Sequence, residues 1–251
     1  MITLQELCLT LDELLDVPTF SDYCPNGLQV QGTPEIKKVA TAVSASLATI
    51  QTAVDHGVNA LIVHHGMFWK GDSYVVSGVK REKLHLLLKN NISLLAYHLP
   101  LDAHQELGNN WKAAQDMQWK NLTPFGEFNG TPIGVKGTIN PQSVSDFQKT
   151  LENYYQHPAN CVFGGKQEVE SVGLISGGAY KMISDAIREG LDCFVTGNFD
   201  EPVWHQAFEE KVNFFAMGHS ATERIGPQAL GNHLKEHFGI ESTFIDIPNP
   251  F

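Results

Sequence analysis

The sequence has no paired cysteines and no long apolar run, and each absence excludes a class of protein. Its four cysteines lie far apart with no Cys-x-x-Cys pair, so neither a disulfide framework nor a thiolate zinc site is indicated. No apolar stretch approaches the roughly 20 residues that a membrane-spanning helix requires. The first residues lack the basic segment and apolar core of a secretory signal. We therefore expect a cytoplasmic protein whose thiols are free and buried.

Basic residues are also scarce. The 17 Lys and Arg against 28 Asp and Glu give a formal net charge of -11, which opposes binding to nucleic acid or to an anionic membrane. The 251 residues, 42% of them apolar, suit a folded globular protein of one large or two modest domains. Histidine is abundant at 11 residues. Imidazole and carboxylate are therefore the metal ligands that the chain offers.

Short apolar runs alternate with helical patterns, which predicts an α/β fold. An amphipathic helix over 3–15 opens the chain, with Thr3 and Glu6 in capping-box spacing. Residues 39–43, 46–56 and 61–63 then predict a strand, a helix and a strand, a βαβ unit. A second such unit begins at Val172 and can be laid on the first at an offset of 133 residues. The identical positions are Val39 and Val172, Ile50 and Ile183, Ala53 and Ala186, and Gly57 and Gly190.

The expected architecture is two similar α/β halves with mixed sheets, which together form one compact unit. The first half spans 1–120 and the second spans 171–251. Glycine-punctuated extended segments fill 121–170, and we expect them to form a connecting or second-layer segment.

Potential metal ligands follow three of the predicted strands: His64 and His65, then His98 and Asp102, then His219 and Glu223. Open α/β sheets place their ligand sites at such strand ends. Neighbouring strand side chains face opposite sides, so His64 and His65 suit two ions better than one. In the structural alternative, one imidazole packs in the core and the other is solvated.

Other roles compete with metal binding at these positions. Ser220 and Glu223 have capping-box spacing, so Glu223 could close a helix N-terminus, and Pro227 opposes an uninterrupted helix from residue 221. His98 could be a core imidazole, a group that orients a ligand, or a proton shuttle. Four further histidines are expected on the surface: His104, His205, His233 and His237.

A glycine pair follows another predicted strand. Gly177 and Gly178 lie between a strand and a helix, where backbone amides can cradle an anion such as phosphate. A tight strand-to-helix turn explains the same pair. The segment Thr196-Gly197-Asn198 follows a neighbouring strand and could reach the same cleft.

Several of these segments together resemble the Nif-three-like family, also called the GTP cyclohydrolase I type 2 homologues. The resemblance rests on DYCPNGLQVQG, LIVHHGMFWKGD, AYHLPLDAH, TGN, GHSATERIG and the final FIDIPNPF, and it covers essentially the whole chain. It implies the Nif-three-like fold, a dinuclear metal site in the cleft between two α/β halves, and a toroidal homohexamer in the cytoplasm. The family's ligand motifs fall here on His64, His65, Asp102, His219 and Glu223, with the glutamate as the bridge. Asn198 departs from the family pattern, because many relatives carry a glutamate there.

Two functions are compatible with these features. The first is a two-metal hydrolase of a nucleotide-like or phosphorylated small molecule, with His98 as a proton shuttle and Gly177 and Gly178 as the phosphate site. The second is a metal-binding protein without turnover, in metal handling or as a scaffold. The ions would be zinc, iron, manganese or nickel, since the ligand types do not choose among them.

Overall fold

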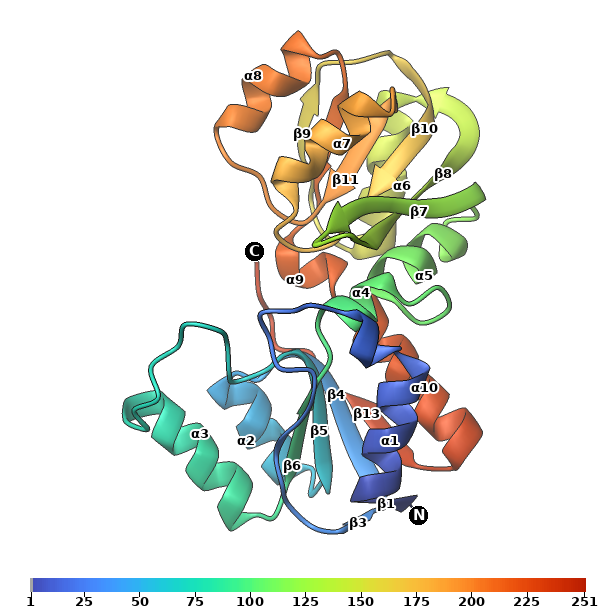
Figure 1. Ribbon diagram of the computed structural model, residues 1–251. Coiled ribbons are helices and arrows are strands. Elements are labelled where there is room, and N and C mark those ends of the chain that lie inside the picture. The colour runs from blue at the N-terminus through green and yellow to red at the C-terminus, as the bar shows by residue number, and fades with distance from the viewer. Residues whose placement is uncertain (1) are drawn as a thin grey trace. The chain divides into compact units, whose positions relative to one another are not determined.

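The computed structural model describes residues 2–251, which divide into two compact units (Figure 1). Unit 1 contains the residues up to Leu101 together with Gly226–Pro248, and unit 2 contains Asp102–Ile225 and Asn249–Phe251. The chain returns to unit 1 because β13 (Glu241–Phe244) pairs in parallel with β4 (Lys38–Ser44). These discontinuous units differ from the division at residues 120 and 170 that the sequence predicts.

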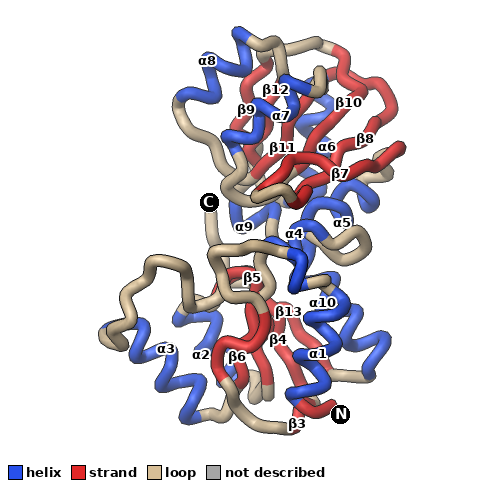
Figure 2. Tube along the Cα trace, viewed as in Figure 1, coloured by secondary structure: helices blue, strands red, loops and turns tan. Residues whose placement is uncertain are grey.

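Unit 1 is built on a five-stranded mixed sheet in the order β13, β4, β5 (Ala60–His65), β6 (Ser93–Ala96) and β2 (Gly27–Val30). In Figures 1 and 2, α2 (Leu47–Asp55) and α3 (Gly78–Lys89) cover one face, and α1 (Leu4–Leu14) and α10 (Ile225–Phe238) cover the other. Nearly every side chain of the central strands is buried on both faces, which explains their continuous apolar sequence. Three short elements complete the unit: β1 (Ile2–Thr3), β3 (Glu35–Ile36) and a 3₁₀ turn at Val17–Thr19.

The opening helix forms as the sequence predicts. The Thr3 hydroxyl accepts a hydrogen bond from the Glu6 amide at 3.1 Å, and the Glu6 carboxylate accepts one from the Thr3 amide at 2.9 Å. This capping box satisfies backbone donors that the first turn of a helix leaves without partners. Leu4, Leu7 and Leu11 of α1 are buried, so the apolar stripe of the helix packs against the sheet.

Unit 2 has a six-stranded mixed sheet in the order β7 (Lys120–Phe128), β8 (Thr131–Ser143), β10 (Glu168–Leu174), β11 (Cys193–Thr196), β12 (Asn213–Ala216) and β9 (Asn160–Phe163). Side chains from α5 (Asn109–Asp116) and α6 (Val144–Tyr155) share one core with the sheet. The other face carries α7 (Ile183–Arg188) and α8 (Pro202–Glu209) (Figure 1). The short helices are α4 (Leu99–Ala103), a 3₁₀ turn at Tyr180–Met182 and α9 (His219–Thr222).

The two units contain the repeated βαβ unit that the sequence predicts. Val39 pairs with Ala60 between β4 and β5, and Val172 pairs with Cys193 between β10 and β11. Both partners are displaced by the same 133 residues, so the two parallel ladders share one register as well as one element order. The prediction of two similar α/β halves is confirmed.

The segment over 121–170 differs from its prediction as a connecting or second-layer segment. It supplies β8, β9 and most of β7, and β8 pairs antiparallel with β10 in the main sheet of unit 2. No helix among residues 2–251 is long and apolar enough to cross a membrane.

Candidate metal centre

Two histidines end β5 of unit 1. His64 is fully buried, and its Nδ1 lies 3.0 Å from the backbone oxygen of Tyr97. Because a carbonyl oxygen can only accept, we assign the His64 proton to Nδ1, which gives Nε2 the lone pair. His65 is partly exposed, and its Nδ1 lies 3.0 Å from the Ser44 hydroxyl. Each imidazole is therefore oriented by a partner on a neighbouring strand or just beyond it.

His98 follows β6 and is oriented by a carboxylate. Its Nδ1 lies 2.9 Å from Oδ1 of Asp22, a side chain that is only 3% exposed. The backbone amides of Cys24 and Leu99 also donate to Asp22. Burial acts to raise the pKa of this carboxyl, but the hydrogen bond and charge interaction with His98 outweigh it, and the pKa lies well below its usual range. Asp22 is therefore an anion that holds the proton of His98 on Nδ1.

These three imidazoles form one cluster. The ring centroids of His64 and His65 are 4.7 Å apart, and those of His64 and His98 are 5.0 Å apart. One nitrogen from each ring lies within 4.8 Å of the others, which is close enough for the group to hold a metal ion. The alternation of side chains along a strand does not keep His64 and His65 apart, since their ring centroids are only 4.7 Å apart.

Aromatic side chains surround His98. Trp69 and Tyr23 each lie 5.2 Å from the His98 ring in edge-on geometry, and the two are 5.7 Å apart. Both line a cavity of about 360 Å³ together with Asp22. Trp69 is thus a wall of this cavity, where its ring can stack on a planar ligand.

In unit 2, Asp102 is buried and fully oriented. Its Oδ1 accepts hydrogen bonds from the Asn109 amide group and the Ser176 hydroxyl, each at 2.9 Å. The Asn110 amide group donates to the backbone oxygen of Asp102 and accepts from the Ser176 amide. A carboxylate held in this way presents its oxygens in a fixed direction, as a metal ligand must.

His219 and Glu223 lie at the two ends of α9. Gly218, with φ of +87°, precedes the helix, and Ser220 makes no side-chain cap. The structural alternative of a Ser220–Glu223 capping box does not form, because the helix begins at His219, two residues earlier than a cap at Ser220 requires. His219 Nε2 lies 3.1 Å from Glu223 Oε1, and Glu223 is 3% exposed. Carboxylate oxygens of Asp102 and Glu223 lie within 4.8 Å of each other, so unit 2 brings together three of the predicted ligands.

Gly177, which the sequence offers as part of an anion loop, lies beside Glu223. Its amide donates to the Thr222 hydroxyl at 3.0 Å, so this donor is engaged within the protein. Its φ is +64°, and a Cβ built there would lie 2.1 Å from Glu223 Oε1. A Cβ on Gly178 would lie 3.6 Å from His219 Cε1. The glycine pair therefore leaves room for the imidazole and the carboxylate.

The segment Thr196-Gly197-Asn198 supports this turn. The amides of Gly197 and Asn198 both donate to the backbone oxygen of Gly177 at 2.9 Å, and the Thr196 hydroxyl donates to it at 3.2 Å. The backbone at position 198 makes this contact with any side chain, so the asparagine that departs from the family pattern leaves the turn intact.

The remaining candidate groups lie outside these clusters. His205 and His237 are exposed as the sequence predicts, whereas His104 and His233 are half-buried. The cysteines are free, and burial raises the pKa of Cys24 to about 11 and that of Cys161 to about 12. Such thiols stay protonated at neutral pH and are poor metal ligands.

Asp22 is a residue of this histidine cluster's surroundings that sequence reasoning missed. It belongs to the DYCPNG segment, but its partner His98 is 76 positions away, and no periodic pattern connects the two. A single aspartate beside a turn gives no signal for such a contact. Only the pairing of β2 with β6 brings the segments together.

Comparison with known proteins gives consistent matches over the full length. The family model of Duf34/NIF3 (NGG1p interacting factor 3) matches residues 2–250. A protein from Chlamydia pneumoniae named "GTP cyclohydrolase 1 type 2 homolog" is 50% identical over 250 residues, covering 98% of each chain. One of the same name from Escherichia coli (strain K12) is 42% identical over 247 residues, again covering 98% of each. Among solved structures, "protein ybgI, unknown function" has a TM-score of 0.93 at 40% identity, with complete coverage of both chains. TTHA1606 from Thermus thermophilus has a TM-score of 0.92 at 33% identity, also with complete coverage.

Proposed function

The chain belongs to the Duf34/NIF3 family, and we propose that it binds two divalent transition-metal ions. The proposed ligands are His64, His65, Asp102, His219 and Glu223, with Glu223 as the bridging carboxylate. Mixed nitrogen and oxygen ligands suit zinc, iron, manganese or nickel.

The observation that carries this proposal is the orientation of the imidazoles in unit 1. Protein imidazoles that bind a metal through one nitrogen usually donate the other N–H to a carbonyl or carboxylate. Of the two proposed imidazole ligands in unit 1, His64 has such a partner in the Tyr97 carbonyl, and His65 Nδ1 is oriented by the Ser44 hydroxyl. A solvated surface histidine needs no such partner. The buried Asp102 and Glu223 add the negative charge that two divalent cations require.

We further propose that the bound ions serve a hydrolytic reaction on a nucleotide-like or phosphorylated small molecule. Two such ions would supply Lewis acidity and a water of lowered pKa. The chain's own contribution is positioning: Asp22 keeps the proton of His98 on Nδ1, so Nε2 can accept a proton and pass it on. Trp69 and Tyr23 would hold a planar group beside that imidazole. The name of the curated relatives, a GTP cyclohydrolase homologue, agrees with this class of reaction.

A second candidate, a metal-binding protein without turnover, is favoured by the closeness of His98 to His64. A third imidazole within ligand distance can complete a closed coordination shell, and structural sites are closed in this way. In that case His98 is a ligand and not a proton carrier.

One experiment separates the two functions. Metal-replete protein is screened for hydrolysis of nucleotides and phosphoesters, before and after removal of the metal by a chelator. The Asp22→Asn variant is measured in parallel for activity and metal content. Turnover that needs the metal, and that falls in Asp22→Asn while metal content is kept, supports the hydrolase. No turnover, with a loss of metal in Asp22→Asn, supports the closed metal site.

A further inference from the structure

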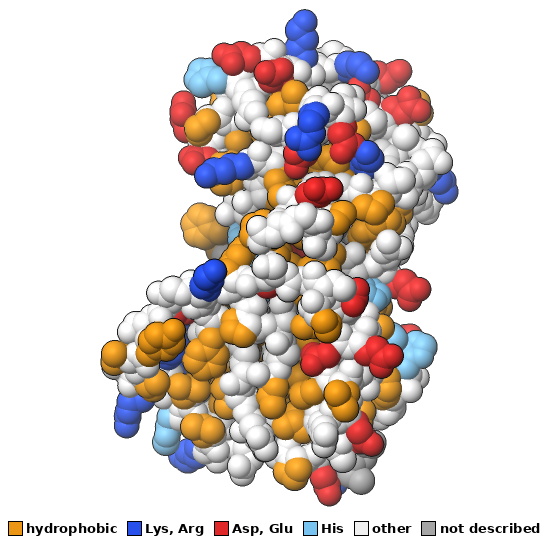
Figure 3. All heavy atoms as spheres, viewed as in Figure 1, with side chains coloured by type: hydrophobic (Ala, Val, Ile, Leu, Met, Phe, Trp, Pro, Cys, Tyr) orange, Lys and Arg blue, Asp and Glu red, His pale blue; other side chains and the backbone are white. Residues whose placement is uncertain are grey.

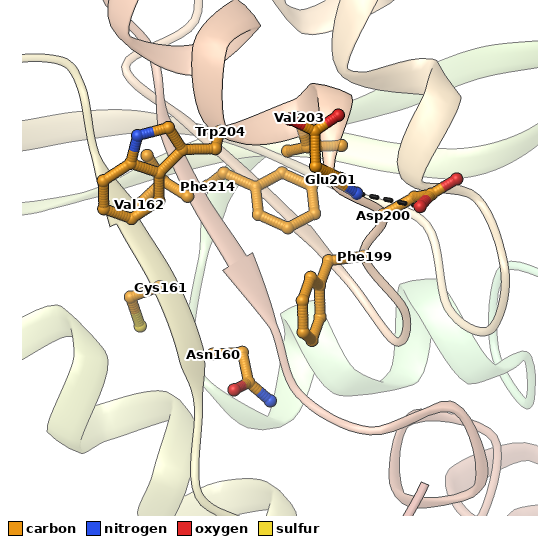
Figure 4. Close-up of a pocket in the computed structure, with 9 residues that line it drawn as sticks. All are labelled: Asn160, Cys161, Val162, Phe199, Asp200, Glu201, Val203, Trp204 and Phe214. Carbon is orange, nitrogen blue, oxygen red and sulfur yellow. Dashed lines mark hydrogen bonds between the residues drawn. The ribbon is translucent and has the colours of Figure 1, made fainter.

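A second pocket lies in unit 2 and shares no lining residue with the proposed metal ligands. Its volume is about 320 Å³, at the lower end of the range for small-molecule sites. It is lined by residues of β9, β12, α8 and the loop after β11: Asn160, Cys161, Val162, Phe199, Asp200, Glu201, Val203, Trp204 and Phe214 (Figure 4). The lining thus combines aromatic, aliphatic and acidic side chains.

The aromatic side chains of this pocket are unusually exposed. Phe199 is 57% and Trp204 is 54% exposed, although both rings border an apolar cavity. Figure 4 shows them on either side of Phe214, which is only 1% exposed and forms the floor. The ring of Phe208 lies 5.1 Å from that of Trp204 and supports the indole. Aromatic surface gathered around a cavity in this way is typical of a binding site.

Both charged residues that line the pocket are acidic. Asp200 and Glu201 line the pocket, and no Lys or Arg is among the lining residues. The Asp200 carboxylate is held in place by the Glu201 amide at 2.8 Å and the Tyr180 hydroxyl at 3.2 Å. Aromatic faces beside fixed carboxylates attract organic cations, because the ring quadrupole and the carboxylate both favour positive charge.

We propose that this pocket binds a small organic cation with a compact alkylammonium head group. The ammonium lies against the faces of Trp204 and Phe199 and near Asp200, while its alkyl groups contact Val203 and Phe214. The small volume favours a free small molecule, and the net charge of -11 on the chain attracts a cation from solution.

Choline and its neutral isostere 3,3-dimethylbutan-1-ol test the proposal, because they have nearly the same shape and differ in charge. The Trp204 indole N–H signal is followed by NMR during titration at constant ionic strength, and it is assigned by its loss in Trp204→Phe. Both titrations are carried out at the same fixed pH, because His205 Nε2 lies 3.6 Å from Glu201 Oε1 at the edge of the pocket. We expect choline to bind about 3- to 30-fold more tightly than the isostere.

Variants test which residues give the preference for choline over its neutral isostere. Asp200→Asn is expected to reduce the preference for choline, and Trp204→Leu to reduce binding of choline more than Trp204→Phe does, as followed by calorimetry. Glu209→Gln, an exposed residue of the same helix, removes the same charge outside the pocket and should change nothing. Equal binding of the two probes would show an apolar pocket only, and an indole signal that choline does not shift would show no site; either result overturns the proposal.

Discussion

At the scale of single residues, Gly177 combines an unusual backbone conformation with close contact to a candidate metal ligand. Its positive φ disfavours any side chain, and its missing Cβ makes room for Glu223 Oε1. Gly190 has nearly the same φ, +68°, but no atom lies within 4 Å of its Cβ position. The two glycines therefore separate the cost of the backbone conformation from the cost of displacing a ligand.

We predict that Gly177→Ala loses metal and that Gly190→Ala does not. Both should destabilise the protein by about 1–2 kcal/mol, since alanine is strained at positive φ. Only Gly177→Ala pushes Glu223 out of position. Urea unfolding measures the first effect and elemental analysis the second. Equal metal content in the two variants would mean that the position of Glu223 does not matter for binding.

Asp192 gives a prediction for the dependence of stability on pH. Burial acts to raise its pKa, but Lys166 and the amides of Ser171 and Glu170 hold the pKa below the ordinary 3.8. The stabilising contribution of a carboxyl with a lowered folded-state pKa is complete above the unfolded-state pKa, and it is lost as the pH falls through the folded-state value.

Asp192→Asn should therefore cost about 1 kcal/mol near neutral pH and progressively less in acid. Urea unfolding free energies between about pH 5 and pH 2 should fall less steeply for the variant than for the wild type. Parallel curves for the two proteins would show that Asp192 titrates at its ordinary pKa.

The ligand types at the strand ends were predictable from the sequence, because strands of an α/β sheet place their last residues at one edge. The partners that orient them were not. Asp22, Tyr97 and Ser44 meet the imidazoles through sheet pairing between distant segments, which leaves no local pattern. The alternative of a helix cap at Ser220 does not form for a local reason, since Gly218 is the N-cap and the helix begins at His219.

At the scale of elements, the repeated βαβ unit is the feature that sequence and structure share most closely. Ile50 of α2 and Ile183 of α7 occupy equivalent positions, and both are fully buried. Each packs its helix against the sheet of its own unit, and neither is near the candidate ligands in the sequence.

We predict that Ile50→Ala and Ile183→Ala each destabilise the protein by about 2–5 kcal/mol, since each leaves a cavity in a closely packed core. Leu88→Ala serves as the control, because Leu88 is 58% exposed and should cost less than about 1 kcal/mol. Denaturant unfolding checks all three. If only one of the two isoleucine variants lost stability, the two βαβ units would not be equivalent in packing.

The antiparallel strands of unit 2 were harder to predict for a physical reason. Gly134 of β8 lies where a Cβ would be 2.5 Å from the Leu174 backbone oxygen, so close strand packing demands glycine there. Pro124 and Gly126 lie within β7 and interrupt its apolar sequence. Such residues break the apolar run that marks a strand, and residues 121–170 therefore gave the pattern of a connecting segment.

At the scale of the whole molecule, apolar side chains are exposed at the start of α3. Tyr74, Val75, Val76 and Val79 are each at least 50% exposed, and hydrophobic side chains gather over this part of unit 1 in Figure 3. An exposed apolar patch of this kind suits contact with another protein surface, such as that of a second copy. We propose on this basis that the chain self-associates, and the family resemblance implies a toroidal homohexamer as the form of the assembly.

We predict a mass greater than that of a dimer in light scattering at micromolar concentration, and a lower mass for Val75→Asp, which puts a charge into the patch. A stable wild-type monomer would contradict self-association. An unchanged mass for Val75→Asp would place the contact elsewhere on the chain.

The measurement that tests the central claim most directly is the number of metal ions per folded chain. Protein purified without chelator and loaded with zinc, iron, manganese or nickel is analysed for metal content, alongside Glu223→Gln and Ser220→Ala. We predict two ions for the wild type and for Ser220→Ala, which keeps every proposed ligand. Glu223→Gln should lose at least one, because the amide lacks the charge and the second equivalent oxygen of a bridging carboxylate. A wild type that never exceeds one ion, or a folded Glu223→Gln that keeps two, would contradict the account.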